Sequence, residues 1–180
     1  MDTSHPETPL SQRLARLKLM AFDVDGVLTD GRLYYTDSGT EIKAFHTLDG
    51  QGVKMLSDAG LKIGLITARR SEVVERRARD LGVHFCFQGA TAKEVAFGEM
   101  LDELKLEPAQ AGYMGDDLLD LPVLIRAGFA ATVPAAPADV QTRCHYVARL
   151  PGGGGAAREV CEMILRAQGG YDKLLAEYCK

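Results

Sequence analysis

The chain of 180 residues contains no tryptophan, few aromatic side chains of any kind and no long apolar run. No stretch approaches the roughly 18 apolar residues that a membrane-spanning helix needs. The N-terminal residues also lack an apolar segment behind basic residues, the pattern of a signal peptide. We therefore expect a protein that does not enter a membrane and that works in the cytoplasm.

Cysteine and positive charge are scarce as well. The four cysteines are scattered and form no Cys-x-x-Cys pair, so neither a zinc site nor a disulfide framework is indicated. Reduced thiols in a cytosolic protein fit this pattern. The 21 basic side chains are outnumbered by 25 acidic ones, which gives a net charge of -4 and argues against a nucleic-acid partner.

What the sequence does contain is an alternation of apolar runs of strand length with helical patterns. This alternation predicts a doubly wound, Rossmann-like α/β fold with a mostly parallel sheet. Residues 1–9 are polar and contain two prolines, so we expect them to be a disordered tail. The remaining residues 10–180 have the length of a single domain with a sizeable core.

Two carboxylates follow the first apolar run, which covers residues 19–22. Asp23 and Asp25 are two positions apart, so an extended backbone would place both on one side at the carboxyl end of a central strand. Carboxylates this close repel each other unless a cation or a proton lies between them, and Mg²⁺ prefers such oxygen ligands. The alternative is that Asp25-Gly26 is only a turn and Asp23 only a strand-end cap.

Further polar residues follow later predicted strands. Thr67 ends a strand over residues 62–67, and Asp116 and Asp117 come directly after a strand over residues 111–114. Because acidic residues at neighbouring strand ends can face one ion, we predict Asp116 as a metal ligand. Asp117 and Asp120 are then predicted as a second ligand or as supporting anchors.

A hairpin is predicted over residues 31–45, where two β-prone runs flank a turn that contains glycine. Tyr34, Tyr35 and Phe45 would form an exposed apolar patch on it. We expect other subunits to cover this patch; the alternative is that the hairpin folds back on its own domain.

Taken in order, these motifs resemble those of the haloacid dehalogenase (HAD) superfamily of aspartyl phosphotransferases. The first motif corresponds to residues 23–30, the second to 65–67, the third to Lys93 and the fourth to 115–120. Members with a cap domain insert it after the first motif, and the roughly fifteen to twenty residues here are too few to fold alone. The resemblance therefore implies a member with no cap domain and a protruding hairpin.

Within the superfamily, the chain resembles the 3-deoxy-D-manno-octulosonate (KDO) 8-phosphate phosphatase family. The matching segments are Asp30-Gly31, Lys43-Ala44-Phe45, Asp49-Gly50, Gln88-Gly89 and residues 152–161. This resemblance implies a Mg²⁺-dependent homotetramer of lipopolysaccharide synthesis, with hairpins packed between subunits. It also implies that the glycine-rich C-terminal region, residues 151–180, can reach an active site.

The resemblance assigns roles to the residues at the matching positions. Asp23 would be the nucleophile that forms an aspartyl-phosphate, and Asp25 the general acid and base. Thr67 would bind a phosphate oxygen, and Lys93 would neutralise Asp23 and the phosphate. The implied metal ligands are Asp23, Asp25 through its backbone carbonyl, Asp116 and Asp117. The candidate substrate-binding residues are His46, Ala68, Arg69, Arg70, Gly154 and Arg158.

Some positions depart from that family. Thr67-Ala68-Arg69 stands where Thr-Gly-Arg is frequent, and Leu48 stands where some members carry an arginine. A missing arginine is a missing partner for a substrate carboxylate, so we predict that Arg69 or Arg70 compensates.

Three other functions stay open. One is a phosphatase for another sugar-acid phosphate, such as a nonulosonate 9-phosphate; another is a receiver-like signalling module that is phosphorylated on aspartate. A third is a scaffold without activity. The second acid, Asp25, and the late Gly115-Asp116-Asp117 motif favour the hydrolase over the receiver.

Overall fold

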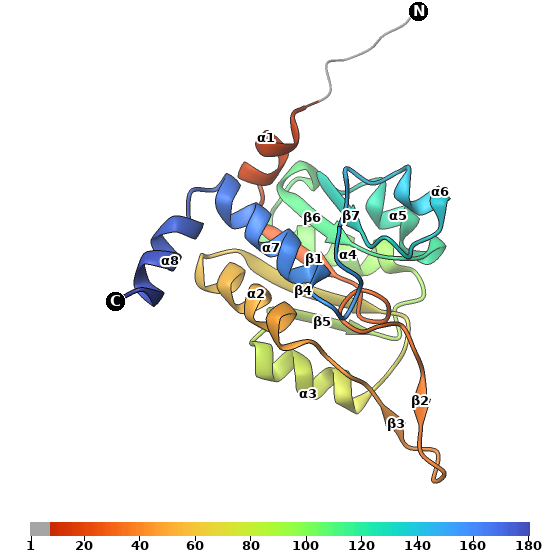
Figure 1. Ribbon diagram of the computed structural model, residues 1–180. Helices are drawn as coiled ribbons and strands as arrows, with labels where there is room; N and C mark the ends of the chain where they lie inside the picture. Colours follow the sequence, from red (N-terminus) through yellow and green to blue (C-terminus); the bar gives the residue numbers. More distant parts are fainter. Residues whose placement is uncertain (1–7) are drawn as a thin grey trace, which may run out of the picture.

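The computed structural model describes residues 8–180. Residues 1–7 of the predicted tail lie outside the described residues. Helix α1 (Leu10–Ala15) begins directly after Pro9 and buries Leu14, as the helical spacing of its leucines predicts. The short helix then leads into the first strand of the sheet (Figure 1).

The centre of the molecule is a six-stranded sheet in which all strand pairs are parallel. The order across the sheet is β5-β4-β1-β6-β7-β8, so the chain winds outward in both directions from a central β1. The strands are β1 (Leu19–Phe22), β4 (Lys62–Thr67), β5 (Phe85–Gln88), β6 (Ala111–Met114), β7 (Phe129–Thr132) and β8 (Tyr146–Val147). The predicted doubly wound, Rossmann-like fold is confirmed.

Strand β1 is buried along its whole length, as expected for a parallel strand with helices on both faces. It pairs with β4 on one side and β6 on the other, with Phe22 opposite Leu65 and Met114. Because these neighbours are parallel, their carboxyl ends meet at one edge of the sheet. The residues that follow β1, β4 and β6 are therefore brought together.

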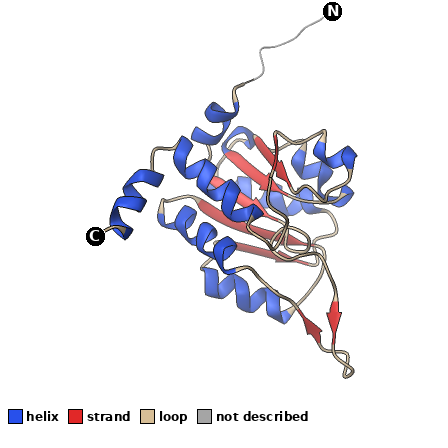
Figure 2. Ribbon diagram, in the orientation of Figure 1, coloured by secondary structure: helices blue, strands red, loops and turns tan. Residues whose placement is uncertain are grey.

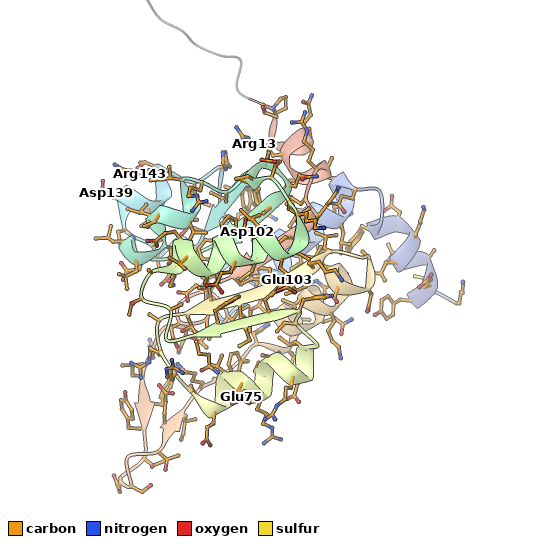
Figure 3. The ribbon with its side chains drawn as sticks, turned by 180° about the vertical axis from the view of Figure 1, so that it is seen from behind. Arg13, Glu75, Asp102, Glu103, Asp139 and Arg143 are labelled. Carbon is orange, nitrogen blue, oxygen red and sulfur yellow. The ribbon has the colours of Figure 1, made fainter. Side chains whose placement is uncertain are left out.

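Helices cover both faces of this sheet. α2 and α7 pack side by side on the face seen in Figure 1, and α4 crosses the opposite face in Figure 3, where Asp102 and Glu103 lie on its exposed side. Within the described residues, no helix is both long and apolar enough to cross a membrane. The helices after α1 are α2 (Thr47–Asp58), α3 (Glu72–Leu81), α4 (Lys93–Leu104), α5 (Leu121–Leu124), α6 (Ala138–Gln141), α7 (Ala156–Ala167) and α8 (Tyr171–Tyr178), with 3₁₀ turns η1 (Pro108–Gln110) and η2 (Leu118–Asp120).

The hairpin consists of β2 (Tyr34–Tyr35) and β3 (Glu41–Ile42), paired antiparallel, and it projects away from the sheet (Figure 2). No cap domain is present between β1 and α2, as predicted. The side chains of Tyr34 and Tyr35 are exposed, whereas Phe45 is half-buried. The Arg77 guanidinium carbon lies 5.4 Å from the centre of the Phe45 ring, so this ring belongs to the domain and not to the predicted exposed patch.

The glycine-rich segment packs against the loop that follows β1. The Gly153 N–H donates to the Val27 carbonyl at 2.9 Å, and a side chain at Gly152 would overlap the Gly26 carbonyl. The resemblance implies that this glycine-rich region can reach an active site. In the structure it makes a close backbone contact with the Asp23 loop, and this contact has no room for side chains.

Candidate active site

The loop after β1 is held in one conformation by its own backbone contacts. The Asp23 N–H donates to the Met114 carbonyl at 2.8 Å, which continues the ladder one residue beyond β1. Gly26 then has a φ of +93°, and a Cβ there would overlap the Asp116 carboxylate. The Thr29 hydroxyl accepts the Gly26 N–H at 3.3 Å and so closes the turn.

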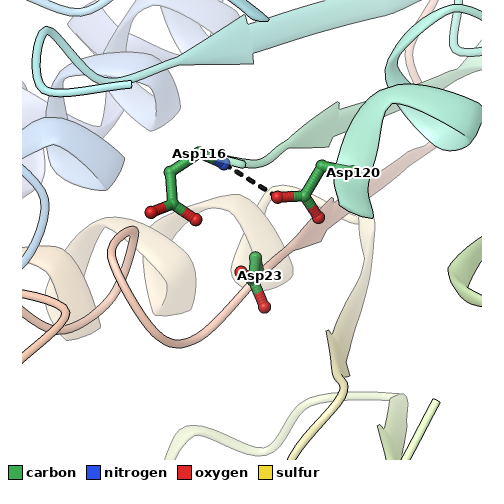
Figure 4. A group of neighbouring side chains, drawn as sticks. All are labelled: Asp23, Asp116 and Asp120. Carbon is green, nitrogen blue, oxygen red and sulfur yellow. Dashed lines mark hydrogen bonds between the residues drawn. The ribbon is translucent and has the colours of Figure 1, made fainter. Parts of the chain in front are cut away.

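Three carboxylates converge beside this loop. Oxygen atoms of Asp23, Asp116 and Asp120 lie within 4.8 Å of one another (Figure 4). Asp120 is fully buried and accepts four hydrogen bonds. Its donors are Lys93 Nζ at 2.6 Å, the Tyr113 hydroxyl at 2.6 Å, and the N–H groups of Asp116 at 2.9 Å and Asp117 at 3.0 Å. Asp120 therefore orients the groups around it.

Lys93 provides the positive charge of this carboxylate cluster. It is the first residue of α4 and is buried, and its Nζ lies 3.0 Å from Asp23 Oδ1 and 2.6 Å from Asp120 Oδ1. Burial alone would lower the pKa of Lys93, but the carboxylates of Asp23 and Asp120 raise it above its ordinary value. The lysine thus lies beside Asp23 as the resemblance implied.

The carboxylate cluster carries more negative charge than Lys93 can neutralise. Burial, followed by the nearby Asp120 carboxylate, raises the pKa of Asp23 well above its ordinary value. The same two causes raise the pKa of Asp116 to about 6. Three carboxylates against one ammonium leave two negative charges, and a divalent cation with a preference for oxygen, such as Mg²⁺, fits this donor set.

Asp117 lies outside the carboxylate cluster. Its side chain is exposed and accepts the Leu118 N–H at 2.7 Å, which caps the 3₁₀ turn η2. Of the two residues considered for the second position, Asp120 and not Asp117 belongs to the carboxylate cluster.

Asp25 pairs with residues of the hairpin and of the loop after β4. Lys43 Nζ donates to Asp25 Oδ1, and Arg69 Nε lies 4.0 Å from Asp25 Oδ2. The two acids that follow β1 therefore have different lysine partners, because the chain bends at Val24 and does not stay extended as far as Asp25. The prediction that the Asp25 carbonyl binds the metal stays a prediction.

The residues that follow β4 border the site. Thr67 is buried at the end of β4, and its hydroxyl accepts the Arg69 N–H at 3.3 Å. Arg69 Nη2 reaches the hairpin, 2.7 Å from Glu41 Oε1 and 3.2 Å from the Tyr35 hydroxyl. Half-buried Ala68 lies between these two residues, and Arg70 packs against Gly89 after β5.

The other predicted substrate residues are not joined to the carboxylate cluster. His46 directly precedes α2, and its buried Nδ1 has no hydrogen-bond partner among residues 8–180. The Gly154 N–H donates to the Pro151 carbonyl at 3.0 Å, so Gly154 lies in a turn. Arg158 Nε donates to Glu162 Oε1 at 2.6 Å, one turn further along α7.

Three buried polar residues of this region had no assigned role. Lys43 pairs with Asp25, Tyr113 supports Asp120, and Asp49 accepts the N–H groups of Gly155 at 3.2 Å and Arg158 at 2.8 Å. The only signal for Tyr113 was a hydroxyl in an otherwise apolar strand, which needs a buried partner.

Comparison with known proteins places this site in a family. A 3-deoxy-D-manno-octulosonate 8-phosphate phosphatase from Yersinia pestis is 43% identical over 163 residues, which cover 91% of this chain and 86% of the relative. The chain belongs to the KDO 8-phosphate phosphatase family. No model of a protein family matches the chain.

Solved structures of KDO 8-phosphate phosphatases have the same fold. The enzyme from Moraxella catarrhalis, in complex with a magnesium ion, a phosphate ion and KDO, is 40% identical with a TM-score of 0.92 over 93% of this chain and 97% of its own. The cobalt-bound form from Haemophilus influenzae is 41% identical with a TM-score of 0.86, over 89% and 94% of the two chains.

Proposed function

We propose that this chain hydrolyses KDO 8-phosphate to KDO and inorganic phosphate, with Mg²⁺ as cofactor, as a cytoplasmic step of lipopolysaccharide synthesis. The observation that carries the proposal is the buried Asp23, held beside Lys93 and the Asp116 and Asp120 carboxylates in a chain of this family. The magnesium, phosphate and KDO bound by the Moraxella relative support the choice of cofactor and substrate.

In the first chemical step, an Asp23 carboxylate oxygen attacks phosphorus and forms an aspartyl-phosphate. The bond from phosphorus to the sugar oxygen breaks, and Asp25 gives its proton to that oxygen. Lys93, 3.0 Å from Asp23 Oδ1, offsets the charge that gathers on the phosphoryl oxygens. Thr67 donates its hydroxyl hydrogen to one of these oxygens.

In the second step, water attacks the same phosphorus while Asp25 removes its proton. The bond to Asp23 breaks, phosphate leaves, and both acids return to their starting forms. Splitting the hydrolysis in this way replaces one difficult displacement by two easier ones. An acid placed two residues after the nucleophile therefore distinguishes this site from a receiver module, in which the phospho-aspartate persists.

The residues that would hold Mg²⁺ are Asp23 and Asp116, with the Asp25 carbonyl, while Asp120 orients them. When bound, the ion supplies positive charge to the phosphoryl oxygens. The substrate carboxylate would bind Arg69 or Arg70, which follow Thr67 at the same edge of the sheet. If Arg69→Ala and Arg70→Ala both leave KM for KDO 8-phosphate unchanged, this part of the proposal is wrong.

The function is tested by phosphate release from a panel of esters, with Mg²⁺ and with EDTA. The panel contains KDO 8-phosphate, a nonulosonate 9-phosphate and glucose 6-phosphate, and Asp23→Asn is the inactive control. We expect Mg²⁺-dependent release that is at least about tenfold faster for KDO 8-phosphate than for the other esters. Faster phosphate release from the nonulosonate 9-phosphate would make that ester the substrate in place of KDO 8-phosphate. Near-equal rates for all three esters would contradict the assignment of a sugar-acid substrate, and no release from any ester would contradict the phosphatase activity.

We also propose a homotetramer in which the hairpins lie between subunits. Leu33, which precedes β2, and Tyr34, Tyr35 and Ile42 on the two short strands are exposed large side chains. An isolated two-stranded hairpin is marginal in water. Contact with other copies of the chain would cover these side chains.

A further inference from the structure

Lys43 is a buried charge on an otherwise exposed hairpin. It follows β3, whose Ile42 is exposed, yet only 1% of the Lys43 side chain is accessible. A buried ammonium costs free energy unless it is paired and hydrogen-bonded. Its partners are Asp25, through Oδ1, and Glu41, whose Oε1 lies 3.5 Å from Nζ.

The pair belongs to a chain of charges that joins the hairpin to the site. Glu41 Oε1 accepts a hydrogen bond from Arg69 Nη2 at 2.7 Å, and Arg69 Nε lies 4.0 Å from Asp25 Oδ2. Glu41 therefore contacts both Lys43 and Arg69. Each carboxylate oxygen of Asp25 lies nearest a different one of these two cations. The closer contact is the one to Lys43, since Arg69 is 42% exposed and too far from Oδ2 for a hydrogen bond.

We propose that Lys43 is a positioning residue for the acid-base step, an inference that rests on the proposed function. By donating to Oδ1, the ammonium fixes the rotation of the Asp25 carboxylate and leaves Oδ2 to exchange the proton. Oδ2 then gives that proton to the sugar oxygen in the first step and takes one from water in the second. The hairpin thus orients the general acid and base of its own subunit.

A role in binding substrate would make a different prediction. Lys43 already contacts two carboxylates, so its charge is compensated before a phosphate arrives. Loss of Lys43 should therefore lower kcat and leave KM nearly unchanged, whereas loss of a substrate contact would raise KM.

The test is a double-mutant cycle measured with the Mg²⁺-loaded enzyme on KDO 8-phosphate. The variants are Lys43→Met, Asp25→Asn and the double variant, with Lys43→Arg as the conservative change. Lys54→Met, an exposed lysine on α2, is the matched control. Thermal unfolding of each variant reports whether it folds, and Lys43→Gln replaces Lys43→Met in the cycle if the latter does not.

We expect Lys43→Met to lower kcat by about tenfold to a hundredfold, with KM changed by less than about threefold. The double variant should be as slow as Asp25→Asn to within about twofold, because Lys43 acts only through Asp25. Lys43→Arg should recover part of kcat, since arginine keeps the charge and the donors, although its geometry differs.

Three results would overturn the inference: a kcat of Lys43→Met within about twofold of wild type, losses that multiply in the double variant, or an effect on KM alone. In each case wild-type turnover would leave the proposed phosphatase intact. An inactive wild-type enzyme would instead contradict the proposed function itself.

Discussion

At the scale of single residues, the active site gathers more negative charge than the buried Lys93 ammonium neutralises. Asp23, Asp116 and Asp120 share one ammonium, and burial, followed by the Asp120 carboxylate, raises the pKa values of Asp23 and Asp116. Mg²⁺ requires the deprotonated carboxylates, so protons and the ion compete for the same oxygens.

This competition predicts a pH dependence of metal binding. The pKa of Asp116 in the absence of metal is about 6, above its ordinary value, so the carboxylate is increasingly protonated as the pH falls below about 6. We expect the Kd for Mg²⁺ to rise as the pH falls, by up to about tenfold per pH unit for each ligand carboxylate that gains a proton, and to level off once Asp23 and Asp116 are both deprotonated. Calorimetric titration from pH 5 to pH 8 measures this, and a Kd independent of pH would contradict the assignment.

The different positions of Asp117 and Asp120 give a second prediction. Asp120→Asn loses acceptor capacity for four donors, of which Lys93 and Tyr113 are buried, and should destabilise the fold by about 2 kcal/mol and weaken Mg²⁺ binding. Asp117→Asn is the matched control on the exposed side of the same turn and should change stability by less than about 0.5 kcal/mol. Denaturant unfolding with and without Mg²⁺ compares the two variants. Equal losses of stability and of stabilisation by Mg²⁺ would contradict the different roles of Asp117 and Asp120.

The sequence predicted the positions of Asp23, Thr67 and Asp116 because each lies at or just after the end of an apolar strand, and parallel strands end at one edge of the sheet. It did not separate the roles of Asp117 and Asp120. Which of them lies beside Asp23 and Asp116 depends on how η2 brings the chain back against Gly115. The contact between Lys43 and Asp25 was not predictable, since it depends on the direction in which the hairpin leaves the sheet.

At the scale of elements, several bounds follow from local pattern alone. β4 and β6 begin and end at the predicted residues, because apolar runs of strand length define them without help from the rest of the chain. The sequence also predicts a helix that opens at Asp49, whereas α2 begins two residues earlier, at Thr47. Ser71 is a plausible N-cap on sequence grounds and does precede α3. Its hydroxyl makes no capping bond to the helix, and its N–H donates to Gln88 Oε1 at 2.7 Å.

The start of α7 depends on a contact between elements that local pattern does not reveal. Asp49, in the first turn of α2, accepts N–H groups of Gly155 and Arg158 and so caps α7 from outside. We expect Asp49→Asn to lower the free energy of unfolding by about 1 to 2 kcal/mol, because its amide nitrogen cannot accept these bonds. Asp58→Asn, exposed at the other end of α2, should be neutral in the same thermal or denaturant unfolding; equal stability of the two variants would contradict the capping role.

At the scale of the whole molecule, one domain carries the chemistry and one hairpin carries exposed apolar side chains. Tyr35→Glu places a charge in this patch and should shift a tetramer toward smaller species. Ser38→Glu adds the same charge at the polar tip of the hairpin and is the control. Light scattering after size exclusion measures the mass, and a tetramer unaffected by Tyr35→Glu would show that the subunits meet elsewhere.

The proposed mechanism depends on formation of a covalent bond between an Asp23 carboxylate oxygen and phosphorus. Borohydride reduces an aspartyl-phosphate to homoserine, so the enzyme is mixed with KDO 8-phosphate and Mg²⁺, quenched during turnover, reduced and digested for mass spectrometry. We predict homoserine at position 23 and at no other acidic residue, with no product when Mg²⁺ is removed. Turnover without any modification of Asp23, or modification of another carboxylate, would contradict the account.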